Sequence, residues 1–194
     1  MDIELKKIEQ DEIVKAFFMQ KKGFLPTYLK YCDKINPIFK SYSAFKKKFV
    51  NENIIWYFIV YNGIKIGEIE IEFKQDFVHI SDFFILSEYQ NRGAGQQVLQ
   101  CIHNMFSDYK HWHLMTIKQE KRNCHLYEKF GYMRTNLEIP INKRMTIIEY
   151  ERKLWGSAVS PVGSVGASAS QRCPPDTRTL TPPYNLNQRS NIND

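Results

Sequence analysis

The residues with the clearest chemical potential form a short loop, Gln90-Asn91-Arg92-Gly93-Ala94-Gly95, between an apolar segment and a segment with helical spacing. Gly93 and Gly95 lack Cβ atoms, so backbone N–H groups can approach a ligand closely. The N-terminus of the helix expected from Gly95 favours negative charge, and Arg92 adds a positive side chain. The loop therefore predicts a site for a phosphate-bearing anion. A tight turn that packs closely without any ligand is the alternative interpretation.

Two common phosphate-binding motifs do not fit this loop. A mononucleotide P-loop needs Gly-Lys followed by Ser or Thr, and no Gly-Lys pair occurs in the chain. A dinucleotide-binding fold needs its glycines directly after the first strand, with an acidic residue on a later parallel strand. The loop here follows several predicted strands. The anion-binding loop therefore belongs to neither class.

A second motif lies further along the chain and ends in Tyr-x-Lys-x-Gly-aromatic. It is Asn123-Cys124-His125-Leu126-Tyr127-Glu128-Lys129-Phe130-Gly131-Tyr132. The pattern Gln90-x-x-Gly93-x-Gly95, followed by a predicted strand and then by this motif, resembles the coenzyme A loop and the next helix of the GNAT acetyltransferase superfamily. The resemblance covers residues 3–151.

The resemblance implies a mixed α/β fold with a central, mostly antiparallel, splayed sheet flanked by helices. It also implies an acyltransferase that moves an acetyl group from acetyl-CoA to a primary amine of a small molecule or peptide. In the superfamily the amine attacks the thioester directly, without an acyl-enzyme. The alternative is a non-catalytic coenzyme A-binding regulatory or interaction module of the same fold.

Donor-binding residues follow from the same resemblance. Backbone groups of Phe83, Phe84 and Ile85 would pair with the pantetheine arm, and the Ile85 amide would stabilise the oxyanion. The pyrophosphate would be held by the loop residues Gln90, Asn91, Arg92, Gly93, Ala94, Gly95 and Gln96. Asn123 is a further candidate contact, since Glu120 stands where the family often carries an asparagine.

Tyr127 matches the tyrosine that commonly lies beside the coenzyme A sulfur in this family. A phenol with a pKa of about 10 can protonate a departing thiolate. For the general base, Glu68, Glu70 and Glu72 alternate with apolar residues and share one strand face. Such a face is solvated by default; if it lines the site, Glu72 is a candidate base. Asp82, next to the expected splay, is the second candidate.

Hydrophobic periodicity predicts helices at residues 11–20, 37–50, 95–109 and 123–130, and strands at residues 54–61, 65–73, 77–86, 113–118, 132–139 and 144–151. Asn62-Gly63 predicts a tight hairpin turn. We expect the acceptor site at the two N-terminal helices and their connection, including residues 24–31, and at this hairpin.

Composition excludes several classes of partner. The chain has 194 residues and a net charge of +6, but no run of five or more basic residues, so we expect no nucleic-acid partner. The four cysteines form no C-x-x-C pair and indicate reduced thiols in a cytoplasmic protein. No apolar run reaches the roughly 18 residues of a membrane helix, so we expect no membrane partner. The resemblance allows a homodimer.

A metal site is not expected. His111 and His113 flank Trp112, but two ligands without a nearby third do not form a metal site. The chain changes character near Leu154, after which Ser, Pro, Gly, Thr and Asn dominate. We therefore expect one acetyltransferase-like domain in residues 1–153 and a disordered low-complexity tail in residues 154–194.

Overall fold

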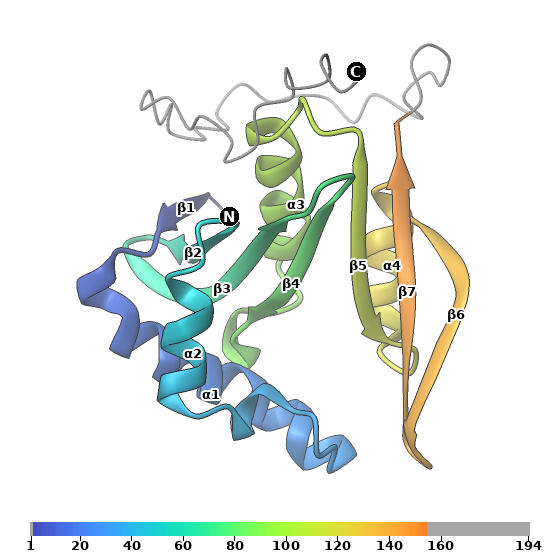
Figure 1. Cartoon of the computed structure of the whole chain (residues 1–194), viewed down its shortest axis with the longest axis horizontal. Coiled ribbons are helices and arrows are strands. Elements are labelled where there is room, and N and C mark those ends of the chain that lie inside the picture. Colours follow the sequence, from blue (N-terminus) through green and yellow to red (C-terminus); the bar gives the residue numbers. More distant parts are fainter. Residues whose placement is uncertain (1, 155–194) are drawn as a thin grey trace, which may run out of the picture.

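The computed structural model describes residues 2–154, which form a seven-stranded sheet with the order β1-β2-β3-β4-β5-β7-β6 (Figure 1). The strands are β1 (Ile3–Lys7), β2 (Ile54–Tyr61), β3 (Ile64–Phe73), β4 (Val78–Ile85), β5 (His111–Ile117), β6 (Met133–Asn142) and β7 (Met145–Lys153). Neighbouring strands pair antiparallel, except that β4 and β5 are parallel. The expected fold class is confirmed.

Helices cover both faces of the sheet (Figure 1). They are α1 (Ile13–Tyr31), α2 (Tyr42–Phe49), α3 (Ala94–Met105) and α4 (Lys121–Lys129), with short 3-10 turns η1 (Gln10–Glu12), η2 (Pro37–Phe39) and η3 (Ser87–Tyr89). Helices α1 and α2 pack on one face, and α3 and α4 pack on the other. No helix within residues 2–154 is long and apolar enough to cross a membrane.

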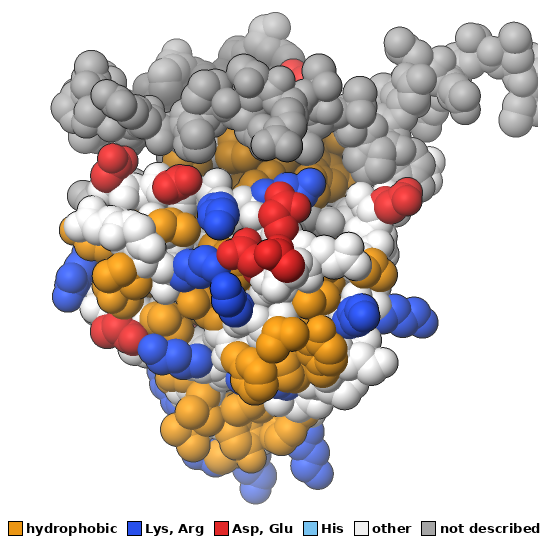
Figure 2. All heavy atoms as spheres, turned by 90° about the vertical axis from the view of Figure 1, so that its left-hand side faces the viewer, with side chains coloured by type: hydrophobic (Ala, Val, Ile, Leu, Met, Phe, Trp, Pro, Cys, Tyr) orange, Lys and Arg blue, Asp and Glu red, His pale blue; other side chains and the backbone are white. Residues whose placement is uncertain are grey.

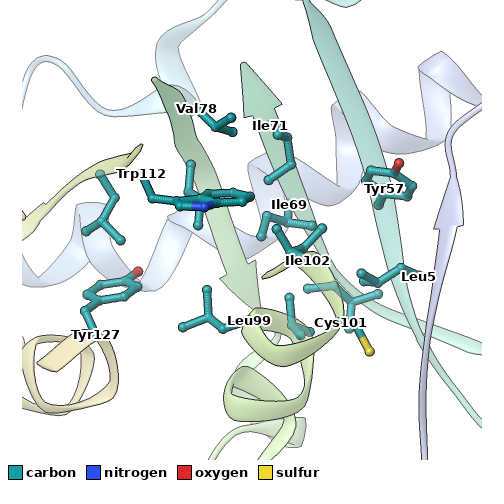
Figure 3. Packing of buried hydrophobic residues seen from close by; sticks show 14 of the residues in the cluster. Leu5, Tyr57, Ile69, Ile71, Val78, Leu99, Cys101, Ile102, Trp112 and Tyr127 are labelled. Atoms are coloured by element: carbon teal, nitrogen blue, oxygen red, sulfur yellow. The ribbon is translucent and has the colours of Figure 1, made fainter. Parts of the chain in front are cut away.

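The alternation of β3 divides its side chains between these two layers. Ile69 and Ile71 are fully buried in the core beneath α3, together with Leu99 and Ile102 (Figure 3). Burial of such an aliphatic side chain stabilises the fold by about 1.5–3 kcal/mol. The glutamates that alternate with these residues therefore point toward α1 and α2.

Strand β1 is absent from the sequence-based prediction. Its five residues pair antiparallel with β2 at the edge of the sheet, with Ile3 opposite Tyr61 and Lys7 opposite Tyr57. Ile3 and Leu5 point into the core. Two apolar residues in a five-residue segment carry too little periodicity to predict a strand, so only the pairing with β2 defines it.

Helix α1 is longer than predicted, because it continues through Gly23 and Pro26 to Tyr31. The prediction that residues 24–31 lie in the connection between two helices is therefore wrong, because these residues belong to α1. A Cβ atom added to Gly23 would lie 2.1 Å from the ring of Phe84, so glycine permits α1 to lie against β4 at this point. The helix ends where Cys32 adopts a left-handed conformation and its amide donates to Tyr28 O at 2.7 Å.

The predicted helix at residues 37–50 is divided into η2 and α2. Asn36 caps η2 by accepting from the Ile38 amide at 3.0 Å, and Ser41 caps α2 by accepting from the Ala44 amide at 3.2 Å. The tail expected from Leu154 onward lies outside the described residues, except for Leu154 itself.

Candidate active site

The parallel pairing of β4 and β5 ends abruptly. The strands pair at Val78–Trp112, His79–His113 and Ile80–Leu114, and no further β4–β5 pair follows in the described sheet. At the same level the β3–β4 register shifts between Glu68 and Glu70, and Asp82 has a φ of +24°. This bulge turns β4 away from β5.

The residues predicted to pair with the pantetheine arm lie beyond this bulge. Phe84 and Ile85 continue to pair with Glu68 and Gly67 on β3. On the other side this part of β4 no longer pairs with β5. A Cβ atom at Gly67 would lie 2.2 Å from the Phe84 carbonyl oxygen. The close approach of β3 and β4 here therefore requires glycine, and it fixes the backbone of the separated segment.

The loop after β4 presents its amides at the start of α3. Asn91 and Gly93 have φ values of +63° and +81°, and Gly93 is the N-cap residue of α3. The first amides that bond back along the helix are those of Gln96 and Gln97, which both donate to Gly93 O at 3.1 and 3.2 Å. The amides before them are the ones a helix N-terminus offers to an anion. The backbone therefore fits a pyrophosphate group.

The side chain of Gln90 has a different role from its neighbours. Its Nε2 donates to the Ile85 carbonyl oxygen at 2.6 Å, which joins the loop to the end of β4. Arg92 is exposed. Ala94 is buried in the main core, and Gly95 packs on α4, where an added Cβ would lie 3.1 Å from Leu126. Gly95 therefore lets α3 and α4 approach closely.

Helix α4 brings two cations to this loop that sequence reasoning missed. The Arg122 guanidinium donates to the Asn91 side chain, and Lys129 Nζ donates to Gln96 Oε1 at 3.1 Å. Both lie in or next to the second motif, but only the packing of α4 beside α3 places them at the loop. Asn123 is exposed in the first turn of α4.

Tyr127 projects from α4 into the core that also holds Leu99 and Trp112 (Figure 3). Its ring lies 6.0 Å from that of Tyr132 and 6.2 Å from that of Tyr150. Burial raises the pKa of the Tyr127 phenol well above its ordinary value of 10.0. The phenol is therefore protonated at neutral pH.

On the opposite face of the sheet, Glu68 and Glu70 are fully buried beneath α1 and α2. The default expectation of a solvated face is therefore wrong for both residues. Neither oxygen of Glu68 has a hydrogen-bond partner among the described residues. Burial, followed by the nearby charge of Asp82, raises the pKa of Glu68 well above 4.5, and the same causes raise that of Glu70 to about 7.

Asp82 is the centre of this cluster. Its carboxylate lies 2.8 Å from Lys40 Nζ and 3.6 Å from Lys48 Nζ, and it accepts from Gln20 Nε2 at 3.2 Å. Lys48 also lies 2.7 Å from a carboxylate oxygen of Glu70. The bulge therefore places one carboxylate at the point of separation and connects it to helices α1 and α2.

Glu72 lies at a different level of the sheet. It pairs in register with His79, where β4 and β5 are still joined, and its carboxylate forms an ion pair with Lys74 at 2.5 Å. The structure thus brings Asp82, Glu68 and Glu70 together at the splay, and leaves Glu72 outside this group.

The C-terminal end of α1 crosses to the far side of the splay. Tyr31 Oη donates to Glu120 at 2.7 Å, and Lys30 Nζ lies 2.6 Å from the same carboxylate oxygen. Asn142 Nδ2 donates to the Tyr31 carbonyl oxygen at 3.0 Å. Glu120 therefore anchors α1 to the start of α4.

A chain of polar contacts crosses the sheet at the base of the splay. The Nδ1 atoms of His79 and His113 lie 2.7 Å apart, His113 Nε2 lies 2.5 Å from Glu149, and Thr135 Oγ1 donates to Glu149 at 2.6 Å. Burial and the neighbouring His113 lower the pKa of His79 to about 4. Within residues 2–154, no group of three or more His, Cys, Asp or Glu residues could hold a metal ion.

Comparison with known proteins agrees with this arrangement. A family model described as an acetyltransferase (GNAT) domain matches residues 29–153, which is more than half of the chain. The chain therefore belongs to the GNAT acetyltransferase family, a class of acyl-transferring enzymes. No curated protein sequence matches the chain.

Solved structures share the fold at low sequence identity. A GNAT-family acetyltransferase from Streptococcus pneumoniae is 16% identical, with a TM-score of 0.63, over 79% of this chain and 100% of that one. The PaiA N-acetyltransferase from Thermoplasma acidophilum, in complex with coenzyme A, is 18% identical, with a TM-score of 0.63 and the same coverage of 79% and 100%. The spermidine N-acetyltransferase from Vibrio cholerae, in complex with CoA and spermine, is 12% identical, with a TM-score of 0.61, over 78% and 95%.

Proposed function

We propose that the chain transfers an acetyl group from acetyl-CoA to a primary amine of a small molecule or peptide, by direct attack in a ternary complex in the cytoplasm. The observation that most supports this proposal is the bulge at Asp82. There β4 leaves β5, with the protonated Tyr127 on the α4 side and the carboxylates of Asp82, Glu68 and Glu70 on the α1 side. This arrangement supports a phenol and carboxylates that act from opposite faces of the sheet.

The donor side is formed by the loop and the separated strand. Acetyl-CoA supplies the activated thioester carbonyl. Backbone amides from Asn91 to Gly95 hold its pyrophosphate, with Arg122 and Lys129 nearby as additional positive charge. Phe83, Phe84 and Ile85 offer backbone groups to the pantetheine arm, and Asn123 is exposed at the edge of this site. The coenzyme A complex of the Thermoplasma protein, which has the same fold, supports this assignment.

On the acceptor side, Asp82 is the group that receives the amine. The Lys40 ammonium lies 2.8 Å from its carboxylate, which supports a preference for cationic groups at this position. An amine must lose a proton before it can attack a carbonyl. Asp82 accepts that proton, and Glu70, with a pKa near 7, can share it at neutral pH. The spermine-bound neighbour makes cationic amines the first acceptors to test.

Tyr127 completes the reaction on the other side of the sheet. Because its phenol remains protonated, Tyr127 can donate a hydrogen bond that stabilises the departing thiolate, and its raised pKa favours this role over complete proton transfer. The group that takes the proton from the amine and the group that stabilises the leaving thiolate are therefore different residues on opposite faces.

A thiol-release assay with acetyl-CoA and a panel of polyamines, aminoglycosides, amino acids and peptide N-termini tests the activity. We expect at least one acceptor, and Asp82→Asn to lower kcat/KM by about 10²-fold or more. Glu72→Gln is the matched control and should leave kcat/KM nearly unchanged, because Glu72 lies outside the splay. If Glu72→Gln lowered kcat/KM more than Asp82→Asn did, the general base would instead be Glu72. No turnover with any acceptor would favour the coenzyme A-binding regulatory module instead.

A further inference from the structure

Helix α1 carries apolar side chains on its solvent side as well as on its core side. Four of them are markedly exposed: Val14 at 48%, Phe18 at 64%, Leu25 at 41% and Leu29 at 66%. At 3.6 residues per turn, these four positions fall within an arc of about 60°. Ile13, Ala16 and Gln20, on the other side of the helix, are buried. The exposed stripe is therefore an apolar surface in addition to the face that packs on the sheet.

The segment after α1 extends this stripe. Ile35 is 61% exposed and Phe39 is 57% exposed, and the Phe39 ring lies 5.0 Å from that of Tyr28 on α1. We call the surface formed by Val14, Phe18, Leu25, Leu29, Ile35 and Phe39 the α1 outer face. Figure 2 shows hydrophobic side chains gathered on this side of the molecule, at the height of α1 and α2, with lysine and arginine side chains and some acidic ones around them. Single exposed apolar residues are ordinary, but a contiguous set indicates a binding surface.

Most of the charge carried by the segment that forms this face is positive. Residues 13–50 contain nine lysines and one acidic residue, Asp33. The net charge of the whole chain is +6, so this segment is more positive than the chain as a whole. Asp33 is buried, and its carboxylate accepts from Asn36. Lys22 and Lys30 pair with Glu88 and Glu120. The exposed lysines Lys15, Lys34, Lys46 and Lys47 have no salt bridge within residues 2–154.

We infer that the α1 outer face binds the surface of an anionic phospholipid bilayer. Exposed Phe, Leu, Ile and Val side chains can enter the boundary between headgroups and acyl chains, while the surrounding lysines contact lipid phosphates. In this contact α1 lies parallel to the membrane surface, so no membrane-spanning helix is needed. The sequence-based expectation of no membrane partner rests on the lack of a spanning segment, and a surface contact does not require one.

Two other partners fit this surface less well. In a symmetric dimer the same surface meets itself, so two lysine-rich segments would face each other and repel. A nucleic acid would attract the lysines, but it offers no apolar surface of comparable extent to the exposed aliphatic side chains. An anionic bilayer satisfies both features. The inference is independent of the acetyl-transfer reaction.

Co-sedimentation of the full chain with vesicles tests this inference. We expect binding to phosphatidylcholine vesicles that contain phosphatidylglycerol, little binding to pure phosphatidylcholine, and release at high salt. Leu29→Ser and Phe18→Ser should each weaken binding about tenfold. Lys46→Gln and Lys47→Gln should each weaken it about fivefold. The controls are Met133→Ser, which is 70% exposed on β6, and Lys110→Gln, before β5.

Thermal melts and sedimentation velocity on the same proteins distinguish the outcomes. Selective loss of vesicle binding by the α1 variants, with unchanged melting temperatures, supports the inference. It is overturned if anionic vesicles retain no protein at low salt, or if the control variants lose binding equally. It is also overturned if Leu29→Ser converts a dimer to a monomer without changing vesicle binding, because the face would then join two copies of this chain.

Discussion

Replacement of the buried Glu70 by glutamine should change how the stability of the protein depends on pH. Burial and the charge of Asp82 raise the pKa of Glu70 from 4.5 to about 7 in the folded protein. Between these two values the folded state binds a proton that the unfolded state does not. The contribution of Glu70 to the free energy of unfolding is therefore present at low pH and is lost as pH rises toward 7.

The size of this contribution follows from the two pKa values. For a pKa of 4.5 in the unfolded chain and about 7 in the folded one, the free energy of unfolding rises by about 2 kcal/mol when the pH falls from 7.5 to 5. Glu70→Gln keeps the shape of the side chain but removes its titration. We expect the variant to lack this gain of about 2 kcal/mol.

Urea unfolding of both proteins at pH 5 and at pH 7.5 measures the difference. Other groups titrate in the same range, His79 among them, with a pKa lowered to about 4. These contributions cancel when the pH dependence of the variant is subtracted from that of the unmodified protein. Identical pH dependence in the two proteins would refute the reasoning, since Glu70 would then titrate as it does in the unfolded chain.

Three further variants test the other parts of the site. Gly93→Glu places a negative side chain at the loop and strains its left-handed backbone, although an added Cβ meets no atom within 4 Å; it should weaken acetyl-CoA binding by calorimetry at least ~100-fold, and unchanged affinity would remove the loop from the donor site. Tyr127→Phe should lower kcat about 10²-fold with little change in acetyl-CoA affinity, and equal kinetics would make Tyr127 structural. Gly67→Ala should lower the free energy of unfolding by about 1–3 kcal/mol, because its Cβ would lie 2.2 Å from Phe84 O; an unchanged urea midpoint would contradict the proposed close approach.

Much of the fold follows from local patterns in the sequence. Strand β2 covers residues 54–61, as predicted; β3 begins one residue before the predicted strand, and β4 is one residue shorter than predicted at each end. Apolar alternation and the Asn62-Gly63 turn act over a few residues, so they are visible in the sequence. Helix α3 begins one residue before the predicted start and ends four residues earlier, at Met105.

Errors occur where packing overrides a local signal. Gly23 and Pro26 indicate the end of a helix, yet α1 continues to Tyr31. The glycine allows the close contact with Phe84, and the helix beyond it is anchored by the bonds between Tyr31, Glu120 and Asn142. These partners are distant in the sequence. No local pattern therefore contains the interactions that extend the helix.

The sequence by itself predicted the anion-binding loop and singled out Tyr127, because glycine spacing and a contiguous motif express local requirements of backbone and side-chain chemistry. It also placed Glu68, Glu70 and Glu72 on one strand face. Only the tertiary structure decided what covers that face. Helices α1 and α2 bury Glu68 and Glu70 beside the bulge at Asp82, while Glu72 lies where β4 and β5 remain paired. Alternation specifies a direction for each side chain, but burial, ion pairing and distance from the splay depend on segments far away in the chain.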